Sequence, residues 1–188
     1  MGAFAISRLL ENLKHCQIDR KTIEIPFACG DNDLDDFYKN DAILYQEDLI
    51  AKTYIIYKDN KIVSFYSLLN DNINSKNENV SKEAFKKIKK KFRHRKQFSS
   101  YPAIKIGRFA VSSDCQKKGI GKSILDFILC NIAGNKQNSS ACRFITVDAY
   151  EKVIGFYEKC GFGPLRNNVS SGTLPMYYDL KQIENSLI

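Results

Sequence analysis

The chain has 188 residues, of which 44% are hydrophobic and 12% aromatic, and this composition is typical of a globular protein that can bury a core. No apolar run approaches the roughly 20 residues of a membrane helix, and the N-terminal stretch lacks the pattern of a signal peptide, so we expect one soluble, cytoplasmic domain over residues 1–188. The net charge of +8 is local, because residues 81–97 contain nine Lys or Arg and one Glu.

The first third of the chain combines a helical pattern with a β-hairpin. Residues 31–48 begin with Asp and Asn residues that suit a helix N-terminus, and apolar residues then recur at roughly helical spacing. Two β-branched and aromatic runs follow at residues 52–58 and 61–69. Because only a short polar turn separates these two runs, they predict a β-hairpin.

The basic segment lies between a predicted loop and a predicted strand. Residues 70–80 are polar and predict a loop. After them, Phe85, Ile88 and Phe92 follow the spacing i, i+3 and i+7, which predicts one narrow apolar stripe on a heavily charged helix. We therefore predict a basic insertion at about residues 70–101. Its cations include Lys86, Lys87, Lys89, Lys90, Lys91, Arg93 and Arg95.

The second half of the chain alternates strands and helices. A predicted strand over residues 103–111 precedes a loop and a predicted helix over residues 122–134. A buried strand follows over residues 142–148, then a short helix over residues 151–162 and a last strand over residues 174–180. This order predicts an α/β protein (an α+β mixed sheet) with helices on both faces of the sheet.

The cysteines give no sign of a metal site. They form no CxxC pair and no cluster with histidine, whereas a metal site needs ligands at converging short spacings. We therefore predict no metal ligands and interpret the cysteines as reduced, small, half-buried side chains. They are Cys16, Cys29, Cys115, Cys130, Cys142 and Cys160.

The segment from Gln116 to Lys122 reads QKKGIGK and stands between the predicted strand and the predicted helix. Backbone N–H groups and the helix dipole favour an anion at a helix N-terminus. Gly119 and Gly121 carry no side chain that would keep a phosphate from the backbone, and three lysines add positive charge. The segment therefore predicts a ligand with phosphate groups, although a tight turn with glycines for geometry alone explains the same spacing.

This segment resembles the pyrophosphate loop of the GNAT superfamily of N-acetyltransferases, whose pattern (Gln/Arg)-x-x-Gly-x-(Gly/Ala) fits residues 116–121. Residues 156–162, FYEKCGF, resemble the later xYxxxGF segment of the same superfamily. Both motifs stand in the expected order and context, and the resemblance covers roughly residues 22–180. It implies the GNAT fold, in which helices flank a central mixed sheet, and N-acetyltransferase activity.

The resemblance further implies acetyl-coenzyme A as the acetyl donor. In such folds the pyrophosphate lies on backbone amides that match residues 117–122, and the pantetheine arm lies along the end of the preceding strand. A backbone N–H near Val111 would then stabilise the developing oxyanion. The residues that the resemblance assigns to cofactor binding are Phe109, Ala110, Val111, Gln116, Lys117, Lys118, Gly119, Ile120, Gly121, Lys122, Phe156 and Lys159.

Tyr157 matches the superfamily's tyrosine that commonly protonates the departing thiolate. A phenol with a pKa near ~10 keeps its proton at pH 7 and can donate it as the thiolate leaves. A core aromatic role is the alternative, because Val153 stands one helical turn earlier. Many members carry Asn seven residues before this tyrosine, whereas this chain has Tyr150, so that contact to the pantetheine arm lacks a counterpart.

A closer resemblance concerns the acceptor. Residues 27–42 (FACGDNDLDDFYKNDA), 52–56 (KTYII) and 106–111 (IGRFAV) are similar, in this order, to segments of one GNAT branch. That branch includes toxins that acetylate the α-amine of aminoacyl-tRNA. The resemblance implies a tRNA acceptor, whose phosphates the basic segment could neutralise. The same charge suits an acidic protein partner, or it marks only a solvated helix.

Several alternatives for the function stay open. Our main prediction is an N-acetyltransferase that moves the acetyl group to a primary amine by direct attack, with the acceptor unassigned. An aminoacyl-tRNA toxin is the leading specific alternative, and a CoA-binding module without activity is the alternative from another class. The amine's proton is expected to leave through a water held by Asp31, Asp33 or Glu151, and assembly as a homodimer is left open.

Overall fold

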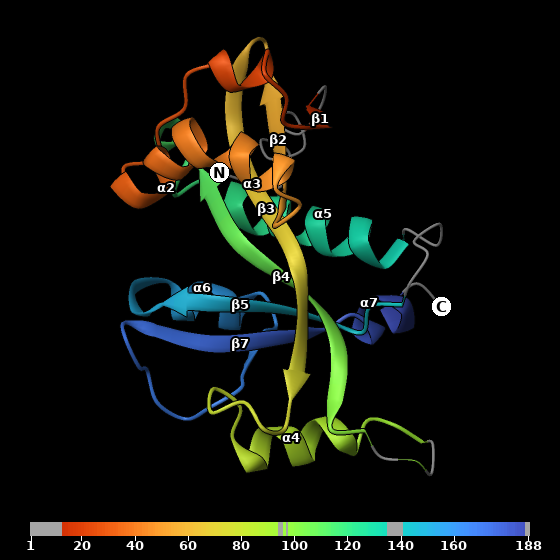
Figure 1. Ribbon diagram of the computed structural model, residues 1–188. Helices are drawn as coiled ribbons and strands as arrows, with labels where there is room; N and C mark the ends of the chain where they lie inside the picture. The colour runs from red at the N-terminus through yellow and green to blue at the C-terminus, as the bar shows by residue number, and fades with distance from the viewer. Residues whose placement is uncertain (1–12, 94–95, 97, 135–140, 187–188) are drawn as a thin grey trace. The chain divides into compact units, whose positions relative to one another are not determined.

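The computed structural model describes residues 13–93, 96, 98–134 and 141–186 (Figure 1). Its strands form one mixed sheet of seven strands in the order β1-β2-β3-β4-β5-β7-β6, which confirms the predicted fold class. The described part of the chain contains no helix that could cross a membrane. The chain divides into two compact units, one of residues 1–69 and 106–125 and the other of residues 70–105 and 126–188.

In the first unit, β1 (Lys14–Gln17) pairs antiparallel with β2 (Lys52–Lys58), which pairs antiparallel with β3 (Lys61–Asn74). Asp59 and Asn60 form the turn of the β2–β3 hairpin, with φ angles of 48° and 58°. Two residues with positive φ define the type I′ turn, whose twist matches that of paired strands. The predicted hairpin is confirmed, whereas β1 was not predicted because four residues give too little periodicity.

The predicted first helix is confirmed as three consecutive helical pieces. They are α2 (Asn32–Asp36), a π-helical turn (Phe37–Asp41) and α3 (Ala42–Glu47). The side chain of Asp31 caps α2 by accepting a hydrogen bond from the N–H of Leu34. The π-helical turn keeps the chain helical while it turns two aromatic side chains into the core.

The core of the first unit is built around the ring of Phe65 on β3. Phe27 meets it edge-on with ring centroids 5.1 Å apart, and Phe37 stacks on it at 6.2 Å. The end of β4 (Ser100–Val111) joins this core through Ala110, whose carbonyl accepts a hydrogen bond of 2.6 Å from Ser64 Oγ. The buried members are Ile18, Cys29, Phe37, Tyr38, Ala42, Ile55, Ile62, Phe65 and Ala110.

In the second unit, β4 pairs in parallel with β5 (Phe144–Tyr150), and β5 pairs antiparallel with β7 (Thr173–Asp179) along its whole length. The short β6 (Gly163–Pro164) pairs with the other side of β7. The prediction of residues 142–148 as a strand was therefore displaced by two residues. Its end was missed because residues 148–150 alternate between exposed and buried and are not continuously apolar.

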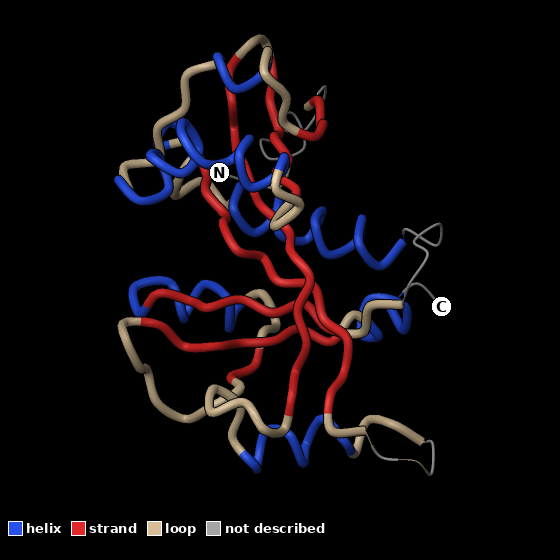
Figure 2. Tube along the Cα trace, in the orientation of Figure 1, coloured by secondary structure: helices blue, strands red, loops and turns tan. Residues whose placement is uncertain are grey.

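Four helices contribute to the second unit. They are α4 (Lys82–Lys89), the later part of α5 (Ile120–Gly134), α6 (Ile154–Lys159) and α7 (Lys181–Ser186). Figure 2 shows α4 between the end of β3 and the start of β4. It packs there because its side chains Phe85 and Ile88 join a core whose buried members are Ile73, Val80, Phe85, Ile88, Tyr101, Ala103, Phe144 and Leu165.

Two predictions in the basic region were wrong in their boundaries. Residues 70–80 were predicted as a loop, but β3 continues to Asn74, because Ile73 is fully buried among polar neighbours. Phe92 was predicted on the helix stripe, but α4 ends at Lys89 and two tighter turns follow, in which the N–H groups of Lys91 and Phe92 donate to carbonyls three residues earlier.

The remaining boundaries differ by a few residues. The strand predicted at 103–111 begins at Ser100, so that Pro102 lies inside β4, and the helix predicted at 122–134 begins at Ile120. The helix predicted at 151–162 is a 3₁₀ turn (Glu151–Val153) followed by α6. The short elements β6 and α7 were not predicted.

Candidate functional site

The loop that follows β4 is held by hydrogen bonds to other segments of the first unit. The N–H of Ser113 donates to the carbonyl of Ala28 at 3.0 Å. The side-chain amide of Gln116 donates from Nε2 to the carbonyls of Cys29 at 2.7 Å and Val111 at 2.9 Å. The Nε2 atom therefore holds the loop against two other segments. This is a positioning role, which the sequence motif alone did not indicate.

The partner segment of the loop is itself anchored on α2. The carboxylate of Asp35 accepts hydrogen bonds from the N–H groups of Cys29 at 2.8 Å and Gly30 at 3.3 Å. Burial and the hydrogen bond to Asp35 raise the pKa of the Cys29 thiol to about 11, so it stays protonated at neutral pH. Cys29 therefore lacks the thiolate character of a nucleophile, and its backbone carbonyl is the group that supports the loop.

The backbone of the loop turns sharply just before α5. Lys117 and Gly119 both have positive φ angles, of 58° and 76°. Alternation of left-handed and ordinary conformations directs successive N–H groups to one side and makes an anion-binding concavity. The helix begins at the next residue, Ile120, and the N–H groups of a first helical turn have no acceptor four residues earlier.

The loop fits the pyrophosphate that the resemblance implies. No described carbonyl accepts a hydrogen bond from the N–H of Lys117, Lys118 or Gly119. The ammonium group of Lys118 donates to the carbonyl of Asp114, so it is partly engaged within the loop. The N–H groups and the charges of the flanking lysines are what the loop can offer to an anion.

The predicted strand residues before the loop differ in exposure. Ala110 is buried in the first core, while Phe109 and Val111 are partly exposed. The N–H of Ser112 donates to the carbonyl of Val63 at 2.9 Å. The strand end is therefore held in place by β3 through its main chain.

Tyr157 lies on α6 and is buried, with 7% of its surface exposed. Its ring meets Phe156 and Phe162 edge-on, with ring centroids 5.2 Å and 5.3 Å away. Burial and the neighbouring Cys160 raise the pKa of Tyr157 above its ordinary value. The phenol is therefore neutral and carries a proton at every pH at which the protein would work.

The other predicted residues near Tyr157 are less buried. Phe156 is partly exposed and Lys159 is exposed on the same short helix. Tyr150, which replaces the asparagine that many members carry, has 42% of its surface exposed at the end of β5. The assignments of Phe156 and Lys159 to cofactor binding stay predictions.

The acidic residues considered as water-holding groups already have neighbours. Asp31 caps α2. The carboxylate of Asp33 lies 3.9 Å from Nε of Arg108, whose guanidinium lies over the ring of Phe37 at 5.0 Å. Glu151 is exposed at the start of the turn before α6. The sequence analysis did not predict this pair, because Asp33 and Arg108 are about 75 residues apart along the chain.

The two histidines lie outside these motifs. His15 Nε2 lies 2.7 Å from the hydroxyl of Tyr66, and burial lowers the pKa of His15. His94 lies outside the described residues. In the part of the chain that the structure describes, no three His, Cys, Asp or Glu side chains form a group that could hold a metal ion.

The basic residues of the predicted insertion fall into two groups. Lys86, Lys87 and Lys90 are exposed on and just after α4. The ammonium group of Lys89 lies over the ring of Phe85 at 5.4 Å, and Lys91 forms an ion pair of 3.0 Å with Asp179. Arg93 is exposed, and Arg95 lies outside the described residues.

Comparisons with known proteins identify the family. A family model described as an acetyltransferase (GNAT) domain matches residues 50–164, which is more than half of the chain. A comparison with curated protein sequences finds no significant match.

Three solved structures share the fold over nearly the whole chain. A tyrosine-to-phenylalanine mutant of KacT has a TM-score of 0.71 at 22% identity and covers 93% of this chain and 98% of its own. AtaT complexed with acetyl-methionyl-tRNAfMet has a TM-score of 0.72 at 17% identity, with 94% and 100% covered. AtaTR bound with AcCoA has a TM-score of 0.72 at 19% identity, with 94% and 98% covered. These similarities show the shared fold, and the family match shows that the chain belongs to the GNAT family, so the protein is an acetyl-CoA-dependent N-acetyltransferase.

Proposed function

We propose that the protein transfers the acetyl group to the α-amine of an aminoacyl-tRNA in the cytoplasm. The observation that carries this acceptor is the exposed cationic surface of Lys86, Lys87 and Lys90, which lies opposite the buried stripe of Phe85 and Ile88. Such a surface binds nucleic-acid phosphates with little regard to sequence. AtaT, a protein of similar fold, is complexed with acetyl-methionyl-tRNAfMet, which is a precedent for this acceptor.

We assign the acetyl-CoA pyrophosphate to the N–H groups of residues 117–122. Gln116 acts on this site indirectly, because its amide holds the loop between the carbonyls of Cys29 and Val111. The main chain of Phe109, Ala110 and Val111 is assigned to the pantetheine arm. Bound acetyl-CoA supplies the thioester that the amine attacks.

We assign Tyr157 as the group that gives a proton to the departing sulfur. Its phenol is protonated because burial raises its pKa. A thiol is more acidic than this phenol, so Tyr157 gives its proton to the departing sulfur only as the attacking amine gives up a proton of its own, which restores the phenol. The edge-on contacts with Phe156 and Phe162 fix the direction of the Tyr157 hydroxyl.

An acceptor assay tests the proposal. The protein is incubated with radiolabelled acetyl-CoA and with bulk aminoacyl-tRNA, deacylated tRNA, free amino acids or a polyamine. Only aminoacyl-tRNA should be labelled, and mass spectrometry after nuclease digestion should detect N-acetyl-aminoacyl-adenosine. If a free amino acid or the polyamine is acetylated and aminoacyl-tRNA is not, the protein is a metabolic acetyltransferase and the proposed acceptor is wrong.

The salt dependence of tRNA binding adds an independent readout. If the surface of α4 contacts about 3–4 phosphates, the logarithm of the binding constant should fall with the logarithm of salt at a slope near ~−2 to −3. Charge reversal at Lys86, Lys87 and Lys90 should flatten this slope and abolish acetylation of tRNA. If the charge reversal leaves tRNA acetylation unchanged, these lysines do not bind tRNA, and an acidic protein partner becomes the favoured interpretation of the cationic surface.

A further inference from the structure

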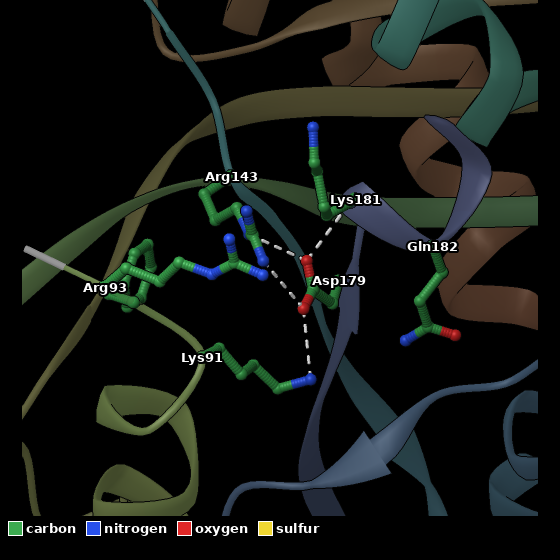
Figure 3. A pocket seen from close by; sticks show the side chains of 7 residues that line it. Lys91, Arg93, Arg143, Asp179, Lys181 and Gln182 are labelled. Carbon is green, nitrogen blue, oxygen red and sulfur yellow. Dashed lines mark hydrogen bonds and ion pairs between the residues drawn. The ribbon is translucent and has the colours of Figure 1, made fainter. Parts of the chain in front are cut away.

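A cavity of about 690 Å³ lies in the second unit, at the end of β7 (Figure 3). This volume is within the range of pockets that bind small ligands. Three segments contribute to its walls, namely the chain after α4, the residue before β5, and the end of β7 together with the start of α7. Its lining residues are Lys91, Phe92, Arg93, Arg143, Asp179, Lys181 and Gln182.

The lining is strongly cationic. It contains four basic side chains and one carboxylate, Asp179. Figure 3 shows the side chain of Arg93 extending toward Arg143, and no carboxylate in the described part of the chain forms an ion pair with Arg93. Like charges that converge on a concave surface repel each other, and an anion between them removes this repulsion.

Asp179 orders the cavity without neutralising it. Its side chain is only 5% exposed, and its Oδ2 lies 3.0 Å from Nζ of Lys91. Arg143 approaches it with Nε 2.7 Å from Oδ1 and donates from Nη2 to Oδ2 at 3.1 Å. Burial acts to raise the pKa of Asp179, but the hydrogen bonds from Lys91 and Arg143 outweigh it and lower the pKa. One fixed negative charge is thus shared between two cations.

Aromatic rings hold Arg143 in one orientation. Phe92 stacks on Tyr101 with ring centroids 4.3 Å apart and the planes nearly parallel. The guanidinium of Arg143 lies 5.2 Å from the ring centroid of Phe92 and 5.8 Å from that of Phe144. A guanidinium that is ordered before binding loses little freedom when it meets a planar or tetrahedral oxyanion. Because Phe92 is already covered by these groups, we expect recognition by charge rather than by stacking of a base.

We propose that this cavity is an anion site that binds phosphoryl groups through Arg93 and Arg143, with Lys181 as a further cation of its lining. A phosphoryl group suits it because it offers several acceptor oxygens to guanidinium forks and carries more than one negative charge. The phosphoryl group belongs either to a small phosphorylated ligand or to an RNA strand. The site does not rest on the proposed acceptor, because none of Lys86, Lys87 and Lys90, which carry that proposal, lines the cavity.

Titration calorimetry on the full chain tests this site. The protein is first saturated with acetyl-CoA, so that loop 117–122 does not compete, and is then titrated with inorganic pyrophosphate or with a hexauridylate RNA without a terminal phosphate. The double variant Arg93→Gln/Lys181→Gln should weaken binding of at least one probe by about tenfold or more, as expected for the loss of a charged hydrogen bond. The control Lys39→Gln/Lys61→Gln removes the same charge from exposed positions of the first unit and should bind as the wild type does.

The two probes distinguish the source of the phosphoryl group. A loss confined to pyrophosphate assigns a small ligand, whereas a loss confined to the hexamer assigns RNA phosphodiesters. If Arg93→Gln/Lys181→Gln binds each probe as tightly as the control Lys39→Gln/Lys61→Gln does, the proposal is wrong. None of these outcomes depends on an aminoacyl group, so they do not change if the proposed acceptor is wrong.

A second variant separates binding from folding. Gln182→Glu adds a carboxylate to the exposed edge of the cavity, where it should not disturb the core, and should weaken binding of the same probe by about threefold or more. The thermal midpoints of all variants are measured alongside. The proposal is wrong if Gln182→Glu binds the probe as the wild type does while Arg93→Gln/Lys181→Gln has lost both binding and thermal stability. In that case the double variant fails to bind because it is unfolded.

Discussion

In the loop between β4 and α5, the side chains of Gln116 and Lys118 bind carbonyl groups of the protein itself, and the N–H groups of residues 117–119 donate to no described carbonyl. On α6 the relation is reversed, because the main chain is engaged in the helix and the acting group is one buried side chain, Tyr157. A motif of the first kind should tolerate many side-chain changes but few changes of backbone conformation. A motif of the second kind should depend on a single hydroxyl oxygen.

The largest expected effect is that of Tyr157→Phe. The substitution removes the proton donor and keeps the ring contacts with Phe156 and Phe162. General acid–base catalysis typically contributes ~10²–10⁴-fold, so kcat should fall by at least about tenfold, while the Kd for acetyl-CoA stays within about twofold. Steady-state kinetics and calorimetry measure the two quantities.

A matched control for this variant is Tyr177→Phe on β7. Tyr177 meets Phe144 edge-on at 5.7 Å, and the same atom is removed from a position that we assign to no ligand. Its kcat should equal that of the wild type. An unchanged kcat in Tyr157→Phe at saturating substrates would assign the proton to another group and leave Tyr157 as a core residue.

The second effect concerns the two glycines of the loop, which the structure separates. Gly119 has a φ of 76°, whereas Gly121 is an ordinary helical residue of α5. Gly119→Val should therefore lower the free energy of unfolding by about 1–2 kcal/mol through backbone strain. Gly121→Val should not, because valine is no worse a helix former than glycine.

Both variants should weaken acetyl-CoA binding by about tenfold or more, if the main chain of this loop meets the pyrophosphate. The control is Cys130→Val, which places the same side chain at an exposed position of α5 and should leave binding unchanged. Normal binding by a folded Gly121→Val variant would mean that the pyrophosphate does not lie close to the main chain at this glycine.

The parts of the molecule that could be predicted from the sequence are those governed by short-range patterns. The hairpin of β2 and β3 follows from two apolar runs around Asp59 and Asn60, whose positive φ angles are the ones that such residues tolerate. The buried stripe of α5 contains Ile120, Ile124 and Ile128, as the helical period predicts. The loop motif was found because all of its residues lie within seven positions.

The parts that could not be predicted depend on contacts between distant segments. The amide of Gln116 reaches the carbonyl of Cys29, which is 87 residues away along the chain, and no local pattern announces such a pair. Arg143 and Asp179 are 36 residues apart and meet only because β5 and β7 pair in the register Phe144↔Asp179. For the same reason, Lys91 could be predicted only as one cation of the basic segment, although it binds a buried carboxylate.

The third effect tests the positioning role of Gln116. Gln116→Ala removes two hydrogen bonds that fasten the loop, each of which contributes about 0.5–1.5 kcal/mol. The free energy of unfolding should fall by about 1–3 kcal/mol, and acetyl-CoA affinity should fall by a few fold because the loop is less ordered. Urea unfolding and calorimetry are the measurements.

The control for Gln116→Ala is Gln17→Ala, at an exposed position at the end of β1, where stability should change by less than about 0.5 kcal/mol. A loss of affinity without loss of stability in Gln116→Ala would mean that the amide contacts the ligand directly and does not act through the loop.

The smallest expected effect compares the two units through a buried tyrosine in each. Burial raises the pKa of Tyr38 to about 12 in the first unit and raises that of Tyr157 in the second. A raised pKa means that the folded protein keeps a proton that the unfolded chain loses above pH 10, so the stabilisation is complete below pH 10 and is lost as the pH rises further.

A rise from pH 9 to pH 11 should therefore lower the free energy of unfolding by about 1 kcal/mol for each of the two tyrosines. In urea unfolding at these two pH values, Tyr38→Phe and Tyr157→Phe should each show a loss smaller than that of the wild type by this amount, and the double variant should show the sum because the sites lie in different units. If Tyr157→Phe loses as much free energy of unfolding between these pH values as the wild type does, the pKa of Tyr157 is not raised by burial. The assignment of Tyr157 as a neutral proton donor would then have no support from its burial.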